Sequence, residues 1–216
     1  MDKPFTVYGA KGSGSVAVES ALTLIGASYQ VVERIAWEEE GARAMAAVNP
    51  MRQVPALVLP TGELMTESAA MLIWLADSHP AARLAPVPDD PRRPAFLRWM
   101  AFVSSQIYSL FWIRDDPSRL AEEDAAKAVV LDRTTERIAA CWRAMEAQIT
   151  PGRFLLGEDL GVLYLYVAVV SRWGPRRKRF YADAPRMAEA VRRVDTDPRL
   201  VTFWAERFPF EGKYAD

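Results

Sequence analysis

The spacing of apolar residues predicts alternating strands and helices in the first part of the chain. Residues 5–8, FTVY, are aromatic or β-branched and predict a strand, and residues 29–35 predict a second one. Between them, residues 15–25 carry apolar side chains at helical spacing, and Gly26 supplies a helix stop. Residues 38–48 form a weaker helical pattern whose first turn is rich in glutamate. This part therefore begins as a β-α-β-α unit.

Residues 47–70, AVNPMRQVPALVLPTGELMTESAA, combine several backbone signals. Residues 53–59 predict a short apolar strand that carries Pro55 near its start, and residues 63–65 predict a strand that pairs back on it. A helix is expected from Thr66 onward, with its apolar stripe at Ala69, Leu72, Ile73 and Ala76. One crossover and one hairpin give a small mixed sheet with helices packed on it, in the thioredoxin-like order.

The rest of the chain predicts helices only. Residues 80–91 contain four prolines and two aspartates and no periodic pattern, which is typical of a semi-rigid linker. The helical patterns beyond it cover residues 94–113, 121–149, 160–173, 184–194 and 199–208. In the second pattern Val129, Ile138, Trp142 and Met145 are expected on the buried side, and the third is apolar almost all round, as in a central helix. We therefore expect an α/β domain over residues 1–80, a linker over 81–91 and an all-helical domain over 92–216.

Composition narrows the function classes. The 216 residues are 50% hydrophobic and 25% charged, with a formal net charge of −1, which is typical of a globular protein and favours neither nucleic acid nor membrane as a partner. The N-terminal residues lack the apolar core of a secretion signal, so we expect a cytoplasmic protein. The single Cys141 excludes an internal disulfide, and one histidine provides no His-based metal cluster. The basic run at residues 176–179 is interpreted as a solvated loop.

The stretch around Pro55 also suggests a binding site. A cis bond between Val54 and Pro55 would turn the main chain of Val54 away from the sheet, where a peptide-like ligand could pair with it. Ser68, at the head of the following helix, offers a hydroxyl and unpaired N–H groups to a carboxylate. Glu67 beside it could accept from an ammonium group. The expected ligand is a small extended peptide that carries both an α-amino and an α-carboxylate group.

The segments NPMRQVPAL and TESAAMLIWLAD resemble the glutathione-binding half of the cytosolic glutathione S-transferases. This resemblance implies a thioredoxin-like domain followed by a helical bundle, glutathione as co-substrate, a small-molecule electrophile as second substrate, and a homodimer. The residues it implies for glutathione are Val54 with Pro55 for the cysteinyl unit, Glu67 and Ser68 for the γ-glutamyl end, and Gln53 with Arg52 for a terminal group. Arg52 is alternatively an ordinary solvated charge.

The segment FLLGEDLGVLYLYVAVVSRW is similar to the signature of this family around its central helix. The family commonly has Ser or Thr where this chain has Gly161, and Asp where it has Tyr164, and those two residues form a reciprocal capping box. Loss of the acidic partner puts local stability in doubt more than activity.

Glutathione chemistry requires a thiolate, so the site needs a group that donates a hydrogen bond to sulfur. The donor must come from the loop after the first strand, and the candidates are Ser13, Ser15 and Tyr8, in that order. The competing interpretation makes Ser15 the helix N-cap and Ser13 a solvated loop residue. Because no cysteine precedes residue 141, a mechanism through a mixed disulfide has no protein sulfur at this loop.

The acceptor pocket is expected between the two domains, against the loop at residues 10–13. Its other expected residues are Tyr8, Gln106, Tyr108, Phe111, Trp112 and Arg114, and since they cover more than one helix face some must belong to the core. An aromatic wall suits an apolar electrophile and Arg114 an acidic one. Two functions stay open, a glutathione transferase and a non-catalytic module of that family that binds ligands or acts in assembly. A thiol-disulfide oxidoreductase is disfavoured by the cysteine count.

Overall fold

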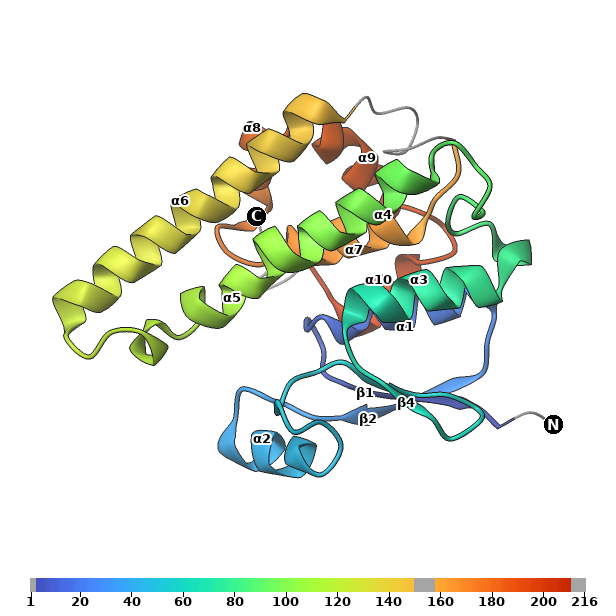
Figure 1. Ribbon diagram of the computed structural model, residues 1–216, viewed down its shortest axis with the longest axis horizontal. Coiled ribbons are helices and arrows are strands. Elements are labelled where there is room, and N and C mark those ends of the chain that lie inside the picture. The colour runs from blue at the N-terminus through green and yellow to red at the C-terminus, as the bar shows by residue number, and fades with distance from the viewer. Residues whose placement is uncertain (1–2, 150–157, 211–216) are drawn as a thin grey trace.

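The computed structural model describes residues 3–149 and 158–210 (Figure 1). Its N-terminal part is built on a mixed four-stranded sheet in the order β2-β1-β3-β4. The strands are β1 (Phe5–Gly9), β2 (Tyr29–Glu33), β3 (Ala56–Val58) and β4 (Leu64–Met65). β1 pairs parallel with β2 and antiparallel with β3, so that Val7 lies opposite both Val31 and Leu57 at the centre of the sheet. The thioredoxin-like order expected from the sequence is confirmed.

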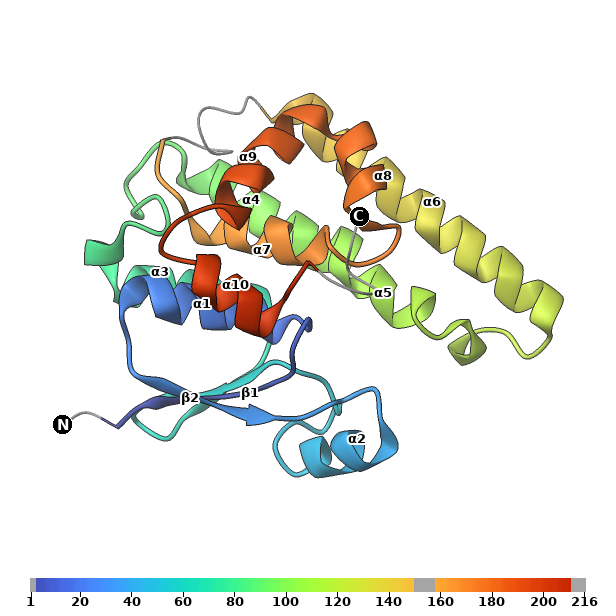
Figure 2. The ribbon, with the colours of Figure 1, turned by 180° about the vertical axis from the view of Figure 1, so that it is seen from behind.

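Three helices accompany the sheet, namely α1 (Ser15–Ile25), α2 (Glu39–Ala46) and α3 (Ser68–Ser78). α1 and α3 pack against each other between the sheet and the C-terminal helices, whereas α2 lies beyond the end of the strands (Figures 1 and 2). Gly26 ends α1 with a left-handed φ of 74° and donates its N–H to the last turn, as a glycine stop should. Leu72 and Ala76 of α3 are buried as expected.

The C-terminal part is helical throughout its described residues. Its elements are η1 (Pro80–Ala82), α4 (Arg93–Phe102), η2 (Val103–Tyr108), α5 (Ser109–Arg114), η3 (Pro117–Arg119), α6 (Asp124–Gln148), α7 (Val162–Val170), α8 (Arg176–Asp183), α9 (Pro185–Asp195) and α10 (Val201–Arg207). The helix expected over residues 94–113 is present, but its middle, η2, is π-helical. α7 is buried along its whole length and contacts α1, α3, α4 and α9, which confirms the prediction of a central helix.

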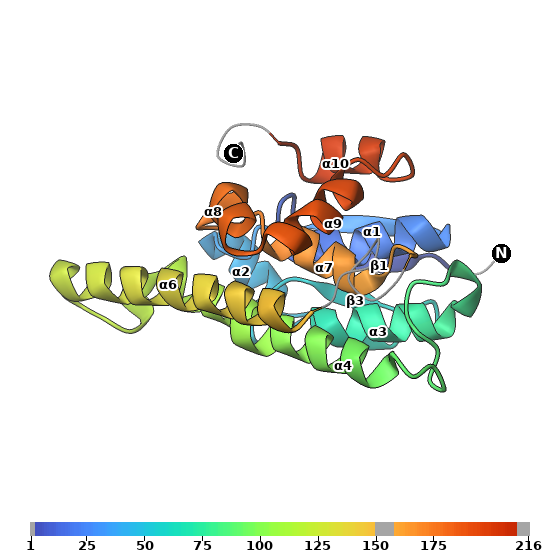
Figure 3. The ribbon, with the colours of Figure 1, turned by 90° about the horizontal axis from the view of Figure 1, so that it is seen from above.

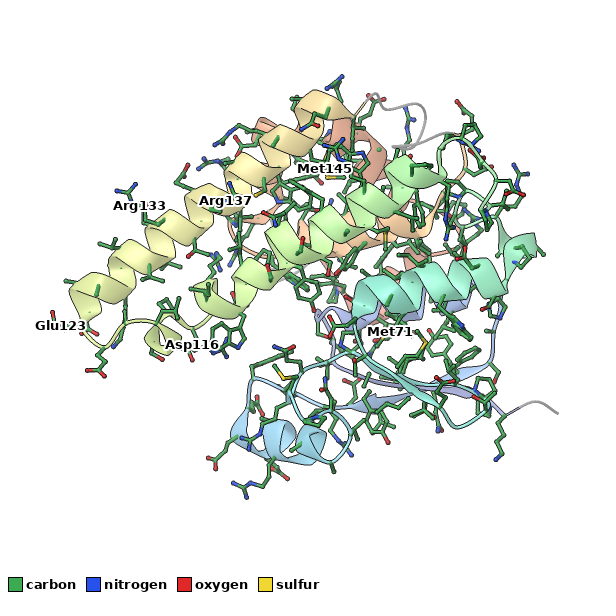
Figure 4. All side chains as sticks on the ribbon, viewed as in Figure 1. Met71, Asp116, Glu123, Arg133, Arg137 and Met145 are labelled. Atoms are coloured by element: carbon green, nitrogen blue, oxygen red, sulfur yellow. The ribbon has the colours of Figure 1, made fainter. Side chains whose placement is uncertain are left out.

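One predicted core position is wrong. Ile138, Trp142 and Met145 of α6 are buried, but Val129 is 58% exposed. The N-terminal half of α6 projects past α8 and α9 (Figure 3), and α5 and η3 pack against α6 but leave Val129 exposed. Figure 4 shows Glu123 and Arg133 along this projecting half, whereas Met145 lies over the bundle. Periodicity identifies the apolar face of a helix but not how far its partners extend along it.

The interpretation of residues 176–179 as a solvated loop is also wrong. These residues begin α8, and the side chain of Arg177 is only 1% exposed. Its guanidinium donates to Asp195 Oδ2 at 2.7 Å and to the carbonyl of Ala168 at 2.7 Å. Arg179 donates to Asp183 at 2.7 Å. A buried charge needs a partner of opposite charge, and here α8 and α9 supply the partners within the bundle.

The start of α7 explains the glycine that replaces the usual cap. Gly161 is the N-cap residue, and the Leu84 carbonyl accepts from the Val162 N–H at 2.8 Å. A Cβ on residue 161 would lie 2.7 Å from that carbonyl oxygen, which is closer than real Cβ contacts come. The main chain of residue 84 therefore takes over the capping role, and it needs glycine opposite it. Tyr164 is buried in the same turn.

No described helix combines the length and the apolar character required to cross a membrane.

Prediction from the cap of α7: Gly161→Ser and Gly161→Ala should both lower the free energy of unfolding, by about 1–3 kcal/mol, since the new Cβ displaces the Leu84 carbonyl. Urea unfolding of both variants measures this. If the missing side-chain cap were the weakness of this helix, Gly161→Ser would instead be more stable than the wild type.

Candidate functional site

A cavity of about 960 Å³ opens between the sheet domain and the helices. Its walls come from the loop after β1, the segment from the end of β2 through α2 to β3, the start of α3, the stretch from η2 to η3, the middle of α7, and residues 172–176. Most of the residues predicted for the site line it, namely Ser13, Arg52, Gln53, Val54, Pro55, Glu67, Ser68, Tyr108, Phe111, Trp112 and Arg114. The structure thus brings both predicted halves of the site to one place.

Three predicted residues do not line the cavity. Ser15 is buried behind Ser13, and Tyr8 lies within β1. Gln106 is exposed and accepts from Arg137 of α6 at 3.1 Å. It stands two residues from Ser104 and from Tyr108, which both line the cavity, and residues two apart on a helix do not share a face. Tyr8 and Gln106 are therefore not among the residues that line this cavity.

The segment before β3 presents main chain to the cavity. The Val54–Pro55 bond is cis, as the sequence suggested. The strand ladder starts at Ala56, whereas the predicted strand began at residue 53, so neither neighbouring strand pairs with Val54. The buried side chain of Asn49 holds this segment in shape, because its amide donates to the Gln53 carbonyl at 3.0 Å and its oxygen accepts from the Met51 N–H at 3.0 Å. Asn49 precedes Pro50, and the Asn-Pro pair is a local signal that favours such side-chain turns.

Ser68 is the first residue of α3, and it is buried. Its hydroxyl lies 2.9 Å from the hydroxyl of Tyr166 on α7. Burial raises the pKa of Tyr166 to about 12, so the phenol is neutral and can donate. Glu67 precedes the helix with φ 64° in the left-handed region, an uncommon conformation for a residue with a side chain and one that is found at functional sites. Tyr166 was missed because it lies inside an apolar run that indicated core alone.

Ser13 and Ser15 form a hydrogen-bonded chain with a buried carboxylate. The Ser13 Oγ accepts from the Ala10 and Ser15 N–H groups, each at 3.2 Å, and lies 2.9 Å from the Ser15 Oγ. The Ser15 hydroxyl donates to Glu19 Oε1 at 2.6 Å. A serine hydroxyl has one proton, and that of Ser15 is committed to Glu19. Ser13 therefore carries the proton that can turn toward the cavity.

The competing interpretation of these serines is wrong in both parts. Gly14 is the N-cap of α1, with no side-chain cap, and Ser15 is the first helical residue. Ser13 is buried rather than solvated. The sequence could not show this, because the Ser15 hydroxyl bonds to Glu19, and Glu19 is buried together with a partner that is distant in sequence.

That partner is Arg207 of α10. Its Nε donates to Glu19 Oε2 at 2.5 Å, and the side chain also pairs with Glu33 at the end of β2. The Arg207 carbonyl accepts from the Gly12 N–H at 2.9 Å, and the Gly12 carbonyl accepts from the Trp173 indole at 2.8 Å. The loop after β1 is thus fixed from three sides by groups far away in sequence.

Aromatic rings form the wall opposite this loop. The rings of Tyr108 and Phe111 lie 4.8 and 5.1 Å from the ring of Trp173, centroid to centroid. Burial raises the pKa of Tyr108 well above its usual range. A Cβ on Gly14 would come within 1.9 Å of the Tyr108 hydroxyl, so this glycine lets the phenol reach the head of α1. Phe111 is buried and Trp112 is 48% exposed, which divides the predicted residues between wall and rim.

Cys141 lies away from the cavity, and its thiol is buried in α6, which raises its pKa. Among the described residues, those that line the cavity include no cysteine.

The architecture is that of a glutathione transferase. It combines a thioredoxin-like sheet, a segment before β3 that presents its main chain to the cavity (the cradle), and a helical bundle that closes the cleft. A family model described as the N-terminal domain of glutathione S-transferases matches residues 15–78. The "Uncharacterized GST-like protein YncG" of Escherichia coli strain K12 is 32% identical over 199 residues, which are 90% of this chain and 94% of that protein. The chain belongs to the glutathione S-transferase family.

Solved structures agree with this. A glutathione transferase homologue from Sulfitobacter, crystallised with bound glutathione, is 27% identical, with a TM-score of 0.79 over 94% of this chain and 97% of that one. A sphingomonad glutathione S-transferase in complex with glutathione is 26% identical, with a TM-score of 0.74 over 91% of this chain and 96% of that one.

Prediction from the buried ion pair: Arg207→Met should lower the free energy of unfolding by about 3–5 kcal/mol, because it leaves the Glu19 carboxylate buried without its cation. The double variant Glu19→Gln with Arg207→Met should recover part of this loss, since no buried charge is then left alone. Urea unfolding of the two single variants and the double variant gives the coupling. Additive effects of the two substitutions would contradict the assignment.

Proposed function

We propose that this protein is a glutathione S-transferase that adds the glutathione thiolate to a small, partly apolar electrophile. The observation that carries the proposal is the hydroxyl of Ser13. Ser13 lines the cavity, whereas the hydroxyl of the neighbouring Ser15 already donates its hydrogen bond to Glu19.

In this proposal the ligand lies along the cradle. The main chain of Val54 pairs with the cysteinyl unit, Ser68 and the N–H groups at the start of α3 receive the γ-glutamyl carboxylate, and Glu67 receives the ammonium group. Gln53 and Arg52 reach the glycine end. Support comes from the common cavity that these residues line and from the glutathione found in the two similar structures.

The chemistry follows from the surroundings of the sulfur. The Ser13 hydroxyl donates to it, and the N-terminus of α1 adds a favourable dipole. A thiol pKa lowered by two units from about 8.5 corresponds to about 2.7 kcal/mol of preference for the thiolate. With an aryl halide the thiolate forms the new C–S bond, halide leaves with the electrons of the old bond, and the thiol proton has already gone to solvent. The rings of Tyr108, Phe111 and Trp173 form the apolar wall for the electrophile.

A second function competes with this one because of one contact. The Ser13 hydroxyl lies 2.9 Å from the Ser15 Oγ, and a proton held there would leave the sulfur without a donor. The protein would then bind glutathione without turnover, as a module of this family that binds ligands or acts in assembly.

Prediction from the serine chain: Ser13→Ala should lower kcat/KM for 1-chloro-2,4-dinitrobenzene at pH 7 by about tenfold or more and move the pH profile of the rate toward the free thiol pKa of about 8.5. Ser15→Ala should have a smaller effect, through the placement of Ser13. Exposed Ser78 at the end of α3 provides the matched control, Ser78→Ala.

Calorimetry of glutathione binding accompanies these assays. Heat of binding without turnover in the wild type would favour the non-catalytic module. An unchanged rate in both Ser13→Ala and Ser15→Ala would remove the serine assignment, and the absence of binding heat at millimolar glutathione would remove the proposed function.

We also propose that the protein is a cytoplasmic homodimer, as the resemblance to the family implies. Exposed apolar side chains at Met51 and Leu97 provide apolar surface for such contacts. Light scattering at micromolar concentration should give twice the mass of one chain, and the mass of a single chain would contradict the proposal.

A further inference from the structure

Basic residues outnumber acidic residues in the lining of the cavity. Five arginines and two acidic residues are among the described residues that line it, in a chain whose formal net charge is −1. Arg52 lies beside the proposed glutathione cradle. The other four arginines lie at or near the aromatic wall, on α5, on η3, on the segment after α7 and at the start of α8. The side of the cavity that would receive the second substrate is therefore positive.

Arg114 differs from its neighbours in this group. It is the last residue of α5, and its guanidinium lies directly against Gly174, where a Cβ would come within 2.0 Å of Nη2. Its Nε is buried and has no hydrogen-bond partner among the described residues. Its one ion pair, from Nη1 to Asp115 at 3.3 Å, is long, and the Asp115 side chain is 62% exposed. A buried donor without a partner is unfavourable. Arg34 and Arg177 also have such an Nε among the described residues, but only Arg114 of the three lines the cavity, where a ligand could complete it.

Two other arginines of the wall have partners within the protein. Arg172 is buried, donates to the Phe208 carbonyl and pairs with Asp195 at 3.4 Å. Burial lowers its pKa to about 10, which keeps it charged at neutral pH. Arg119 pairs with Asp116 and donates to the Trp112 carbonyl. These two and Arg176 add positive charge to the wall, whereas Arg114 is the cavity arginine with a buried donor that has no partner among the described residues.

We infer that the electrophile carries a carboxylate or a similar planar oxyanion on an aromatic body, with the anion on Arg114 and the ring against Trp112 and Trp173. Guanidinium and carboxylate match in a two-point hydrogen bond, and an aromatic ring suits the flanking indoles. This inference rests on the proposed function for the identity of the ligand as a substrate. It adds the class of substrate, an aromatic acid rather than a neutral apolar compound.

The test uses unreactive ligands, so that it does not depend on turnover. 3,5-Dinitrobenzoate and 1,3-dinitrobenzene share the ring and differ in the carboxylate, and both quench tryptophan fluorescence, for which Trp112 and Trp173 are in place. Dissociation constants are measured for the wild type, Arg114→Met, Arg114→Lys and the control Arg133→Met. Arg133 is exposed on the projecting half of α6, away from the cavity (Figure 4).

The wild type should bind the benzoate more tightly than the neutral compound. Arg114→Met should raise the dissociation constant of the benzoate by about 10- to 100-fold, the range expected for loss of a charged hydrogen bond. The dissociation constant of the neutral compound should change by less than about threefold. Arg114→Lys should fall between, since it keeps the charge and loses the planar donor pair. Arg133→Met should change neither ligand.

Three results would overturn the inference. They are an unchanged benzoate affinity in Arg114→Met, an equal loss for both ligands, and a loss confined to glutathione, which would assign Arg114 to the tripeptide. Failure of the proposed function gives a different result, because a protein that fails to bind or use glutathione can still hold the benzoate through Arg114. Conversely, the protein could conjugate 1-chloro-2,4-dinitrobenzene and show no preference for the acid that depends on Arg114. That result would support the proposed function and contradict the inference about the substrate class.

Discussion

The site depends on one buried ion pair between the first helix and the last. Glu19 is fully buried, and Arg207 reaches it across 188 positions of sequence. Arg207 compensates the charge of this buried carboxylate, which also accepts a hydrogen bond from the Ser15 hydroxyl. Ser13 is therefore the serine whose hydroxyl hydrogen is available to the cavity. The same arginine holds the Gly12 main chain. Stability and chemistry in this loop therefore have a common cause.

The two halves of the molecule complete each other in the same manner elsewhere. Tyr166 of the central helix meets the hydroxyl of Ser68 at the start of α3, and the Leu84 carbonyl caps α7 in place of a side chain. In the first case the partner lies in the other half, and in the second it lies in the segment that connects the two halves. Each half therefore depends on the other to satisfy some of its buried polar groups, and the walls of the cleft are fixed by hydrogen bonds between the two halves.

Local signals in the sequence were sufficient for most of the elements and for the main-chain turn before β3. Periodicity predicted α1, α3 and α7, and Pro55 between two turn signals predicted the cis bond that turns main chain toward the cavity. What failed depended on distant partners. Val129 is exposed because no other element covers its side of α6. Arg177 is buried because it forms an ion pair with Asp195 of α9. Glu19, Arg207 and Tyr166 gave no local signal, since a charged residue on an amphipathic helix or a tyrosine in an apolar run is ordinary by itself.

The distance in sequence between Glu19 and Arg207 has a consequence for how the protein is made. On the ribosome the sheet and α1 emerge early, and helices and local pairings form within microseconds of becoming available. Arg207 is synthesised 188 residues after Glu19. Until it emerges, the loop after β1 has its local hydrogen bonds but lacks the ion pair and the main-chain contact that α10 supplies. The final arrangement of Ser13 and Ser15 is therefore completed long after the strands and α1 beside them have formed.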